Sequence, residues 1–99
     1  PPAEALGEQA EEPSEYRMLT LILRSQGDKQ RDVLRLRRLY GELVSSPGRD
    51  RFGMMIVEGG HTFLMEFPNQ STGITPELLT RLKAMVGEEN IKIERVKIQ

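Results

Sequence analysis

The chain has no cysteine and no tryptophan, one histidine, and only 5% aromatic residues among its 99 positions. Without cysteine there is no disulfide framework, no cysteine-ligated zinc, no iron–sulfur cluster and no thiol catalysis. No apolar run approaches the roughly 20 residues that a membrane-spanning helix needs, and the start lacks the basic and apolar regions of a signal peptide. We therefore expect a cytoplasmic protein with a single small core.

Charge is divided unevenly along the chain. Residues 1–15 carry five glutamates and no lysine or arginine, a charge of −5. Residues 16–99 carry all 14 bases against 10 acids, a charge of +4. The first segment has one large apolar side chain, Leu6, and cannot bury enough surface to offset its ordering entropy. We expect a disordered acidic linker over 1–15, a small α+β interaction domain over 16–99 and, from the start at Pro1, a fragment of a longer protein.

Periodicity in the body predicts four strands and two helices. Leucines alternate with other residues from 19 to 23, which is typical of a strand with one apolar face. Gly59-Gly60 separates two further alternating runs and favours a two-residue hairpin. Thr75 as N-cap and Pro76 at the first helical position open the second helix. The expected elements are strands over 16–24, 51–58, 61–67 and 91–98, the last allowing a bulge near 94–95, and helices over 29–44 and from 76 to the stop at Gly87.

This βαββαβ order predicts an α+β, ferredoxin-like sandwich, with two helices on one face of a four-stranded sheet. An open mixed sheet with another strand order is the alternative. In the first helix, 100° per residue places Val33, Leu36, Tyr40, Leu43 and Val44 in one core-facing stripe. The other sheet face would have no cover and carries more apolar groups than a solvated face should, which suggests a partner or an adjoining domain.

The residues offer little for catalysis, and we expect no catalytic residue, no metal and no cofactor. His61 stands beside the hairpin turn, where a lone histidine is more often exposed than catalytic. The Gly-Gly turn lacks the Lys-Ser/Thr of a phosphate-binding loop. The run from Arg51 to Val57 begins like an RNA-binding RNP1 pattern but has methionine where stacking aromatics should stand. Phe63 and Phe67 share a face and are expected in the core.

Arginines are the main charged feature of the body. Arg31, Arg35 and Arg38 fall opposite the apolar stripe of the first helix, and Arg49 and Arg51 follow it after the turn. One interpretation is a solvated helix face, in which nearby carboxylates pair with these bases for a few tenths of a kcal/mol each. The functional interpretation is that these five arginines bind an acidic partner or the DNA backbone through bidentate contacts.

Several strings in the body are similar to one protein family: Arg24–Asp32, Leu36–Gly41, Ser46–Phe52, Leu64–Asn69, Pro76–Leu79 and Gly87–Asn90. Together they resemble the extreme C-terminal domain of the alpha subunit of bacterial DNA polymerase III, the replicative polymerase, in the form found in photosynthetic bacteria. The resemblance covers roughly residues 17 to 98. Its most widely shared element is the junction at Pro47-Gly48, between a helix and a strand.

The resemblance implies an accessory domain that follows the polymerase core and an OB-fold and contacts the tau subunit of the clamp loader. Such a domain couples the polymerase to the replisome, and the family's catalytic aspartates lie in other domains, so the isolated chain is expected to be no enzyme. It contains no clamp-binding motif of the Gln-x-x-Leu-Phe kind. Two alternatives stay open: a nucleic-acid-binding module that uses the basic helix face, and a regulatory domain that binds a small ligand and dimerises through its sheet.

Overall fold

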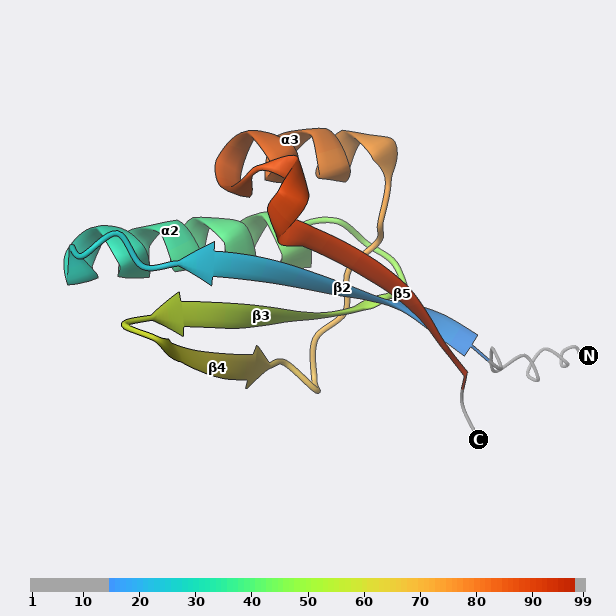
Figure 1. Ribbon diagram of the computed structural model, residues 1–99. Helices are drawn as coiled ribbons and strands as arrows, with labels where there is room; N and C mark the ends of the chain where they lie inside the picture. Colours follow the sequence, from blue (N-terminus) through green and yellow to red (C-terminus); the bar gives the residue numbers. More distant parts are fainter. Residues whose placement is uncertain (1–14, 98–99) are drawn as a thin grey trace, which may run out of the picture.

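A computed structural model describes residues 15–97, with two helices stacked on one side of a four-stranded sheet (Figure 1). The α+β class and the βαββαβ order are therefore confirmed. Residues 1–14, which make up most of the expected linker, lie outside the described residues, and Glu15 already belongs to the first strand. The elements are β2 (Glu15–Arg24), α2 (Lys29–Val44), β3 (Arg51–Glu58), β4 (His61–Glu66), α3 (Pro76–Val86), the 3-10 turn η1 (Glu88–Asn90) and β5 (Ile91–Lys97).

The sheet has the strand order β4-β3-β2-β5. β2 and β3 are parallel and α2 connects them, whereas β3–β4 and β2–β5 are antiparallel pairs. Because β2 and β3 are direct neighbours, no strand is inserted between them as in a split βαβ unit, and the order is that of an open mixed sheet. The β2–β5 register runs without a break from Glu15↔Lys97 to Leu21↔Ile91, so the bulge allowed for near 94–95 does not form.

A single core lies between the sheet and the two helices. Three aromatic rings meet at one end of it, with the Phe52 and Phe67 centroids 5.0 Å apart and Tyr40 within 6.2 Å of both. Each helix contributes one stripe, and β2 and β3 contribute alternate residues. The buried apolar residues are Leu19, Leu21, Leu23, Leu39, Leu43, Phe52, Met54, Ile74, Leu78, Leu82 and Val86.

The buried side of α2 agrees with the predicted one in part, since Leu43 is buried and Leu36 and Tyr40 pack against the core. Leu39 is fully buried, whereas Val33 and Val44 are 43% and 37% exposed. The reason is α3, which packs beside the C-terminal half of α2, where Arg81 Nε donates to Glu42 Oε1 over 2.6 Å. The core-facing stripe therefore points between the sheet and α3, and the flank that carries Val33 turns away from the core.

Both helices begin as predicted. The Asp28 carboxylate accepts a hydrogen bond from the Arg31 N–H (3.2 Å), and the Thr75 hydroxyl accepts one from the Leu78 N–H (3.1 Å). These bonds satisfy backbone donors that a helix start leaves without an intrahelical partner. Gly87, which follows α3, has a φ of 90°, a positive value that glycine adopts readily.

The loop after α2 and the loop before α3 cross and are held together by hydrogen bonds. Ser46 Oγ donates to the Gly73 carbonyl and Thr72 Oγ1 to the Leu43 carbonyl, both over 2.6 Å. Thr72 and Asp50 also exchange two backbone hydrogen bonds of 2.8 Å. The segment that was predicted to end α2 is thus bonded to the loop before α3, and the two loops form one junction.

The Asp50 carboxylate ties β2 to this junction. Arg17 approaches it with two nitrogens, Nη2 at 3.0 Å and Nε at 3.3 Å, and the Ile74 N–H donates to it over 3.0 Å. Burial alone would raise the pKa of Asp50, but the hydrogen bonds from Ile74 and Arg17 and the positive charge of Arg17 outweigh it and hold the pKa below its ordinary value.

Candidate interaction surface

An open groove lies between the N-terminal half of α2 and the β3–β4 hairpin, on the helix face of the sheet. It forms because α3 contacts β2 and β5 and α2 lies beside α3, so that neither helix covers β4. The groove has a volume of about 190 Å³. Its lining comprises Leu23, Arg24, Ser25, Lys29, Asp32, Val33, Arg35, Leu36, Ile56, Glu58 and Met65.

The groove is apolar where its three walls meet. Leu23 and Ile56 come from the sheet, Val33 and Leu36 from α2, and Met65 from β4. Met65 is 38% exposed, and Val33 was expected in the core. Sequence reasoning missed this site because it assigned Val33 and Leu36 to the core-facing side of α2, whereas both line the groove.

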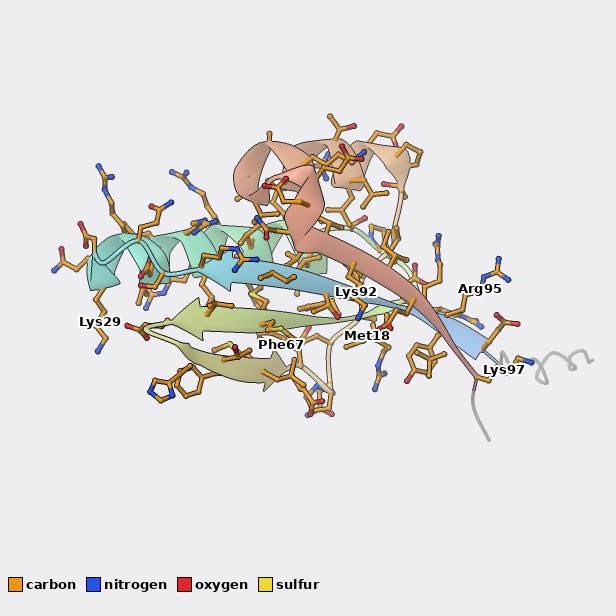
Figure 2. The ribbon with its side chains drawn as sticks, in the orientation of Figure 1. Met18, Lys29, Phe67, Lys92, Arg95 and Lys97 are labelled. Carbon is orange, nitrogen blue, oxygen red and sulfur yellow. The ribbon has the colours of Figure 1, made fainter. Side chains whose placement is uncertain are left out.

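The end of the groove near the start of α2 is charged. Arg24, Lys29 and Arg35 lie there with Asp32 and Glu58, and Arg35 Nη1 donates to the Arg24 carbonyl over 3.2 Å. Figure 2 shows Lys29 at the N-terminal end of α2, on the side of the hairpin turn. Bases exceed acids by one here, so a ligand with both an apolar and an acidic group matches the lining.

Asp32 holds this end of the groove in place. Ser25 Oγ donates to Asp32 Oδ2 over 2.7 Å, and the Gln26 N–H donates to Oδ1 over 3.2 Å. These two hydrogen bonds, with a smaller effect from the charge of Arg35, lower the pKa of Asp32 below its ordinary value. The β2–α2 turn is therefore bonded to the first helical turn, which makes it a fixed wall.

The five arginines proposed from the sequence do not form one surface. Arg31, Arg35 and Arg38 lie on α2, where Arg31 is within 4.0 Å of Asp28 and Arg35 bonds the β2 end. Arg49 is exposed in the loop before β3. Arg51 lies on the opposite sheet face, with its guanidinium 6.0 Å from the centre of the Tyr16 ring and a 3.0 Å hydrogen bond to the Pro68 carbonyl.

The second face of the sheet has no helix over it, as predicted (Figure 1). Met18 from β2 and Leu64 from β4 fold across Gly53, where a Cβ would meet the Met18 Cε at 3.3 Å and the Leu64 Cδ1 at 3.9 Å. Side chains on this face therefore cover one another in part. Among the apolar and hydroxyl side chains that share it are Met18, Thr20, Ile22, Met55, Val57 and Leu64.

The hairpin end carries the histidine and one misplaced aromatic. His61 is exposed, and its ring centre lies 6.3 Å from that of Phe63. Phe63 was expected in the core, but neither α2 nor α3 covers β4, and the residue is 55% exposed. Residues 15–97 hold no cluster of three or more potential metal ligands. Within the same part of the chain, no helix has the length and apolar character needed to cross a membrane.

Comparison with known proteins adds no relative. No protein-family model matches the chain, and no curated protein or solved structure matches it either.

Proposed function

We propose that this chain is a non-catalytic interaction domain that binds a partner protein in the groove between α2 and the β3–β4 hairpin. The observation that carries this proposal is the groove's composition: Val33, Leu36, Ile56 and Met65 form an apolar floor next to a charged end. Recognition sites in proteins commonly combine an apolar floor with a few placed polar groups.

The resemblance to the polymerase III alpha subunit supplies the partner. On this proposal the domain belongs to a cytoplasmic replicative DNA polymerase, and a segment of the clamp-loader tau subunit occupies the groove. An apolar side chain of that segment contacts Val33 and Met65, and a carboxylate faces Lys29 and Arg35. The domain thereby tethers the polymerase in the replisome during DNA replication.

Calorimetric titration of the chain with the tau subunit tests the proposal. We expect a dissociation constant in the micromolar range for the unmodified chain. Val33→Lys places a charge in the apolar floor and should weaken binding at least tenfold, which corresponds to about 1.4 kcal/mol.

Leu34→Lys is the matched control, because Leu34 is the neighbouring apolar residue on α2 but is 61% exposed and lies outside the groove lining. It should bind tau as the unmodified chain does. Circular dichroism establishes that both variants are folded. No binding at tens of micromolar, or equal weakening by both variants, contradicts the proposal.

Exposed arginines on α2 favour a second candidate, binding of single-stranded DNA. Arg31 and Arg38 are exposed, and the ion pair of Arg31 with Asp28 is long, at 4.0 Å. Fluorescence anisotropy with a labelled oligonucleotide over a salt series separates the two functions, because phosphate contacts give a steep loss of affinity with salt. DNA binding should decrease in Arg31→Ala and Arg38→Ala, and Val33→Lys should not weaken it, because that variant adds a positive charge to α2.

A further inference from the structure

β4 forms an outer edge of the sheet, and its outer side pairs with no other strand among residues 15–97. Phe63 and Leu64 are each 55% exposed, and Met65 is exposed as well. Natural proteins usually protect such an edge with lysine, proline, a bulge or a covering segment. β4 has the sequence His-Thr-Phe-Leu-Met-Glu and pairs with β3 residue for residue, so it has none of the first three.

The other edge of the same sheet is protected. Figure 2 shows Lys92, Arg95 and Lys97 following one another along β5. Arg95 lies 3.8 Å from Glu15, and Lys92 lies 3.6 Å from Glu94, so this edge is lined with charges and ion pairs. Charged side chains of this kind prevent a second chain from adding to an edge. The contrast singles out β4 as the edge that is open to pairing.

The hairpin fixes which backbone groups of β4 point outward. Gly59 and Gly60 form the two-residue turn, both with positive φ, and Glu58 pairs with His61 beside it. Antiparallel pairs alternate between those that exchange hydrogen bonds and those that do not. Starting from a bonded pair at the turn, this alternation leaves the N–H and C=O groups of Thr62, Leu64 and Glu66 at the outer edge.

We propose that a second copy of this chain adds to β4, antiparallel and centred on Leu64, so that two sheets join into one of eight strands. In this register the outward groups of Thr62, Leu64 and Glu66 meet those of Glu66, Leu64 and Thr62 of the partner subunit. The three exposed apolar side chains are matched as well. Leu64 faces Leu64 of the partner subunit on one side of the sheet, and Phe63 faces Met65 of the partner subunit on the other.

Charge is compatible with this pairing. Glu66, the only acidic residue of β4, faces a threonine of the partner subunit, and no two like charges stand opposite each other. Facing apolar pairs stabilise a sheet, whereas like charges directly opposite would destabilise it. The outer edge of β4 is therefore complementary to the same edge of a second copy.

The contact is small compared with permanent dimers, which bury roughly 2,000 Å² or more. We expect a reversible monomer–dimer equilibrium that favours the dimer only at high concentration, or where several chains are held together. This inference does not rest on the proposed tau contact. Met65 lines the groove and also faces Phe63 of the partner subunit, so the two contacts share that residue, whereas Val33 belongs to the groove alone and Leu64 to the β4 pairing alone.

Disulfide trapping tests the register, because the chain has no cysteine of its own. In the proposed pair, Leu64→Cys would face its own copy with Cα atoms about 5.5 Å apart, within the range that a disulfide spans. Phe63→Cys would be offset from its copy by two residues, roughly 7–8 Å away, and should cross-link more slowly. Leu34→Cys is the matched control for an exposed leucine on another surface.

We expect Leu64→Cys to form covalent dimers at least tenfold faster than Leu34→Cys under mild oxidation. Sedimentation equilibrium on the unmodified chain should show a mass that rises with concentration, and Leu64→Lys should abolish the rise while Leu34→Lys does not. A strictly monomeric unmodified chain at millimolar concentration, or equal cross-linking rates at 63, 64 and 34, would overturn the proposal. So would an unmodified chain that pairs only when tau is added. Thermal unfolding checks that each variant retains the fold.

Discussion

Gly48 and Gly73 lie against each other where the loop after α2 crosses the loop before α3. A Cβ built on Gly48 would stand 2.4 Å from the Gly73 Cα. One built on Gly73 would stand 2.0 Å from the Pro47 carbonyl oxygen. Since the obstructing atoms are backbone on both sides, no side-chain rotation relieves the contact.

Gly73→Ala should therefore destabilise the fold by about 1–3 kcal/mol or more, because the crossing loops must separate to admit the methyl group. Gly41→Ala is the control: it lies in α2 with no atom within 4 Å of the added Cβ, and it should stabilise the fold by about 0.5–1 kcal/mol. Urea unfolding measures both. Equal stability of the two variants would contradict the close approach.

Stability should depend on acid through Asp50. A carboxylate whose pKa is lowered in the folded state stabilises the fold above its unfolded pKa, and this contribution is lost as pH falls through the folded value. The ordinary pKa of an aspartate is 3.8, so the loss of stability should begin below about pH 5 and continue as the pH falls below 3.8. Asp50→Asn should lower the urea midpoint at pH 7 and flatten its decline towards pH 3.

Glu58→Gln serves as the control, because Glu58 is an exposed carboxylate at the hairpin. It should keep the acid decline of the unmodified chain. If Asp50→Asn declines as steeply as the unmodified chain, the contacts from Arg17 and Ile74 are not what holds the ionised form.

The orientation of α2 can be tested with two truncations. Leu39→Ala removes a fully buried side chain and should cost about 2–5 kcal/mol, whereas Val33→Ala removes one that is 43% exposed and should cost less than about 1 kcal/mol. Chemical denaturation of both variants measures the difference. A larger loss of stability for Val33→Ala than for Leu39→Ala would mean that Val33 faces the core, as the sequence predicts, and does not line the groove.

Local signals in the sequence were sufficient for the elements of this fold. Asp28 and Thr75 cap their helices, and Gly59-Gly60 closes the hairpin, because each depends on residues within a few positions. Strand order is different, since it depends on which strands meet across the whole chain. The neighbouring placement of β2 and β3 leaves no trace in their own alternation, so the mixed sheet could be given only as an alternative.

The candidate site was less accessible from the sequence. An apolar residue that recurs with the period of a helix or a strand is predicted to be core even where no second layer covers it, so Val33 on α2 and Phe63 on β4 were assigned to the interior. What separates Val33 from Leu39 is the position of α3, which covers one flank of α2 and leaves the other open. The arginines illustrate the same limit, because Arg51 sits in sequence near Arg49 but belongs to the opposite face of the sheet.

The pairing of β2 with β5 also bears on when this domain can fold. β2 is made first and β5 last, yet they are neighbours in register from Glu15↔Lys97 to Leu21↔Ile91. During synthesis, the edge of β2 that pairs with β5 stays unpaired until β5 leaves the ribosome. Pairings between distant parts of a chain are slow to form and expose strand edges meanwhile. Completion of the sheet is therefore expected only after translation of the whole domain.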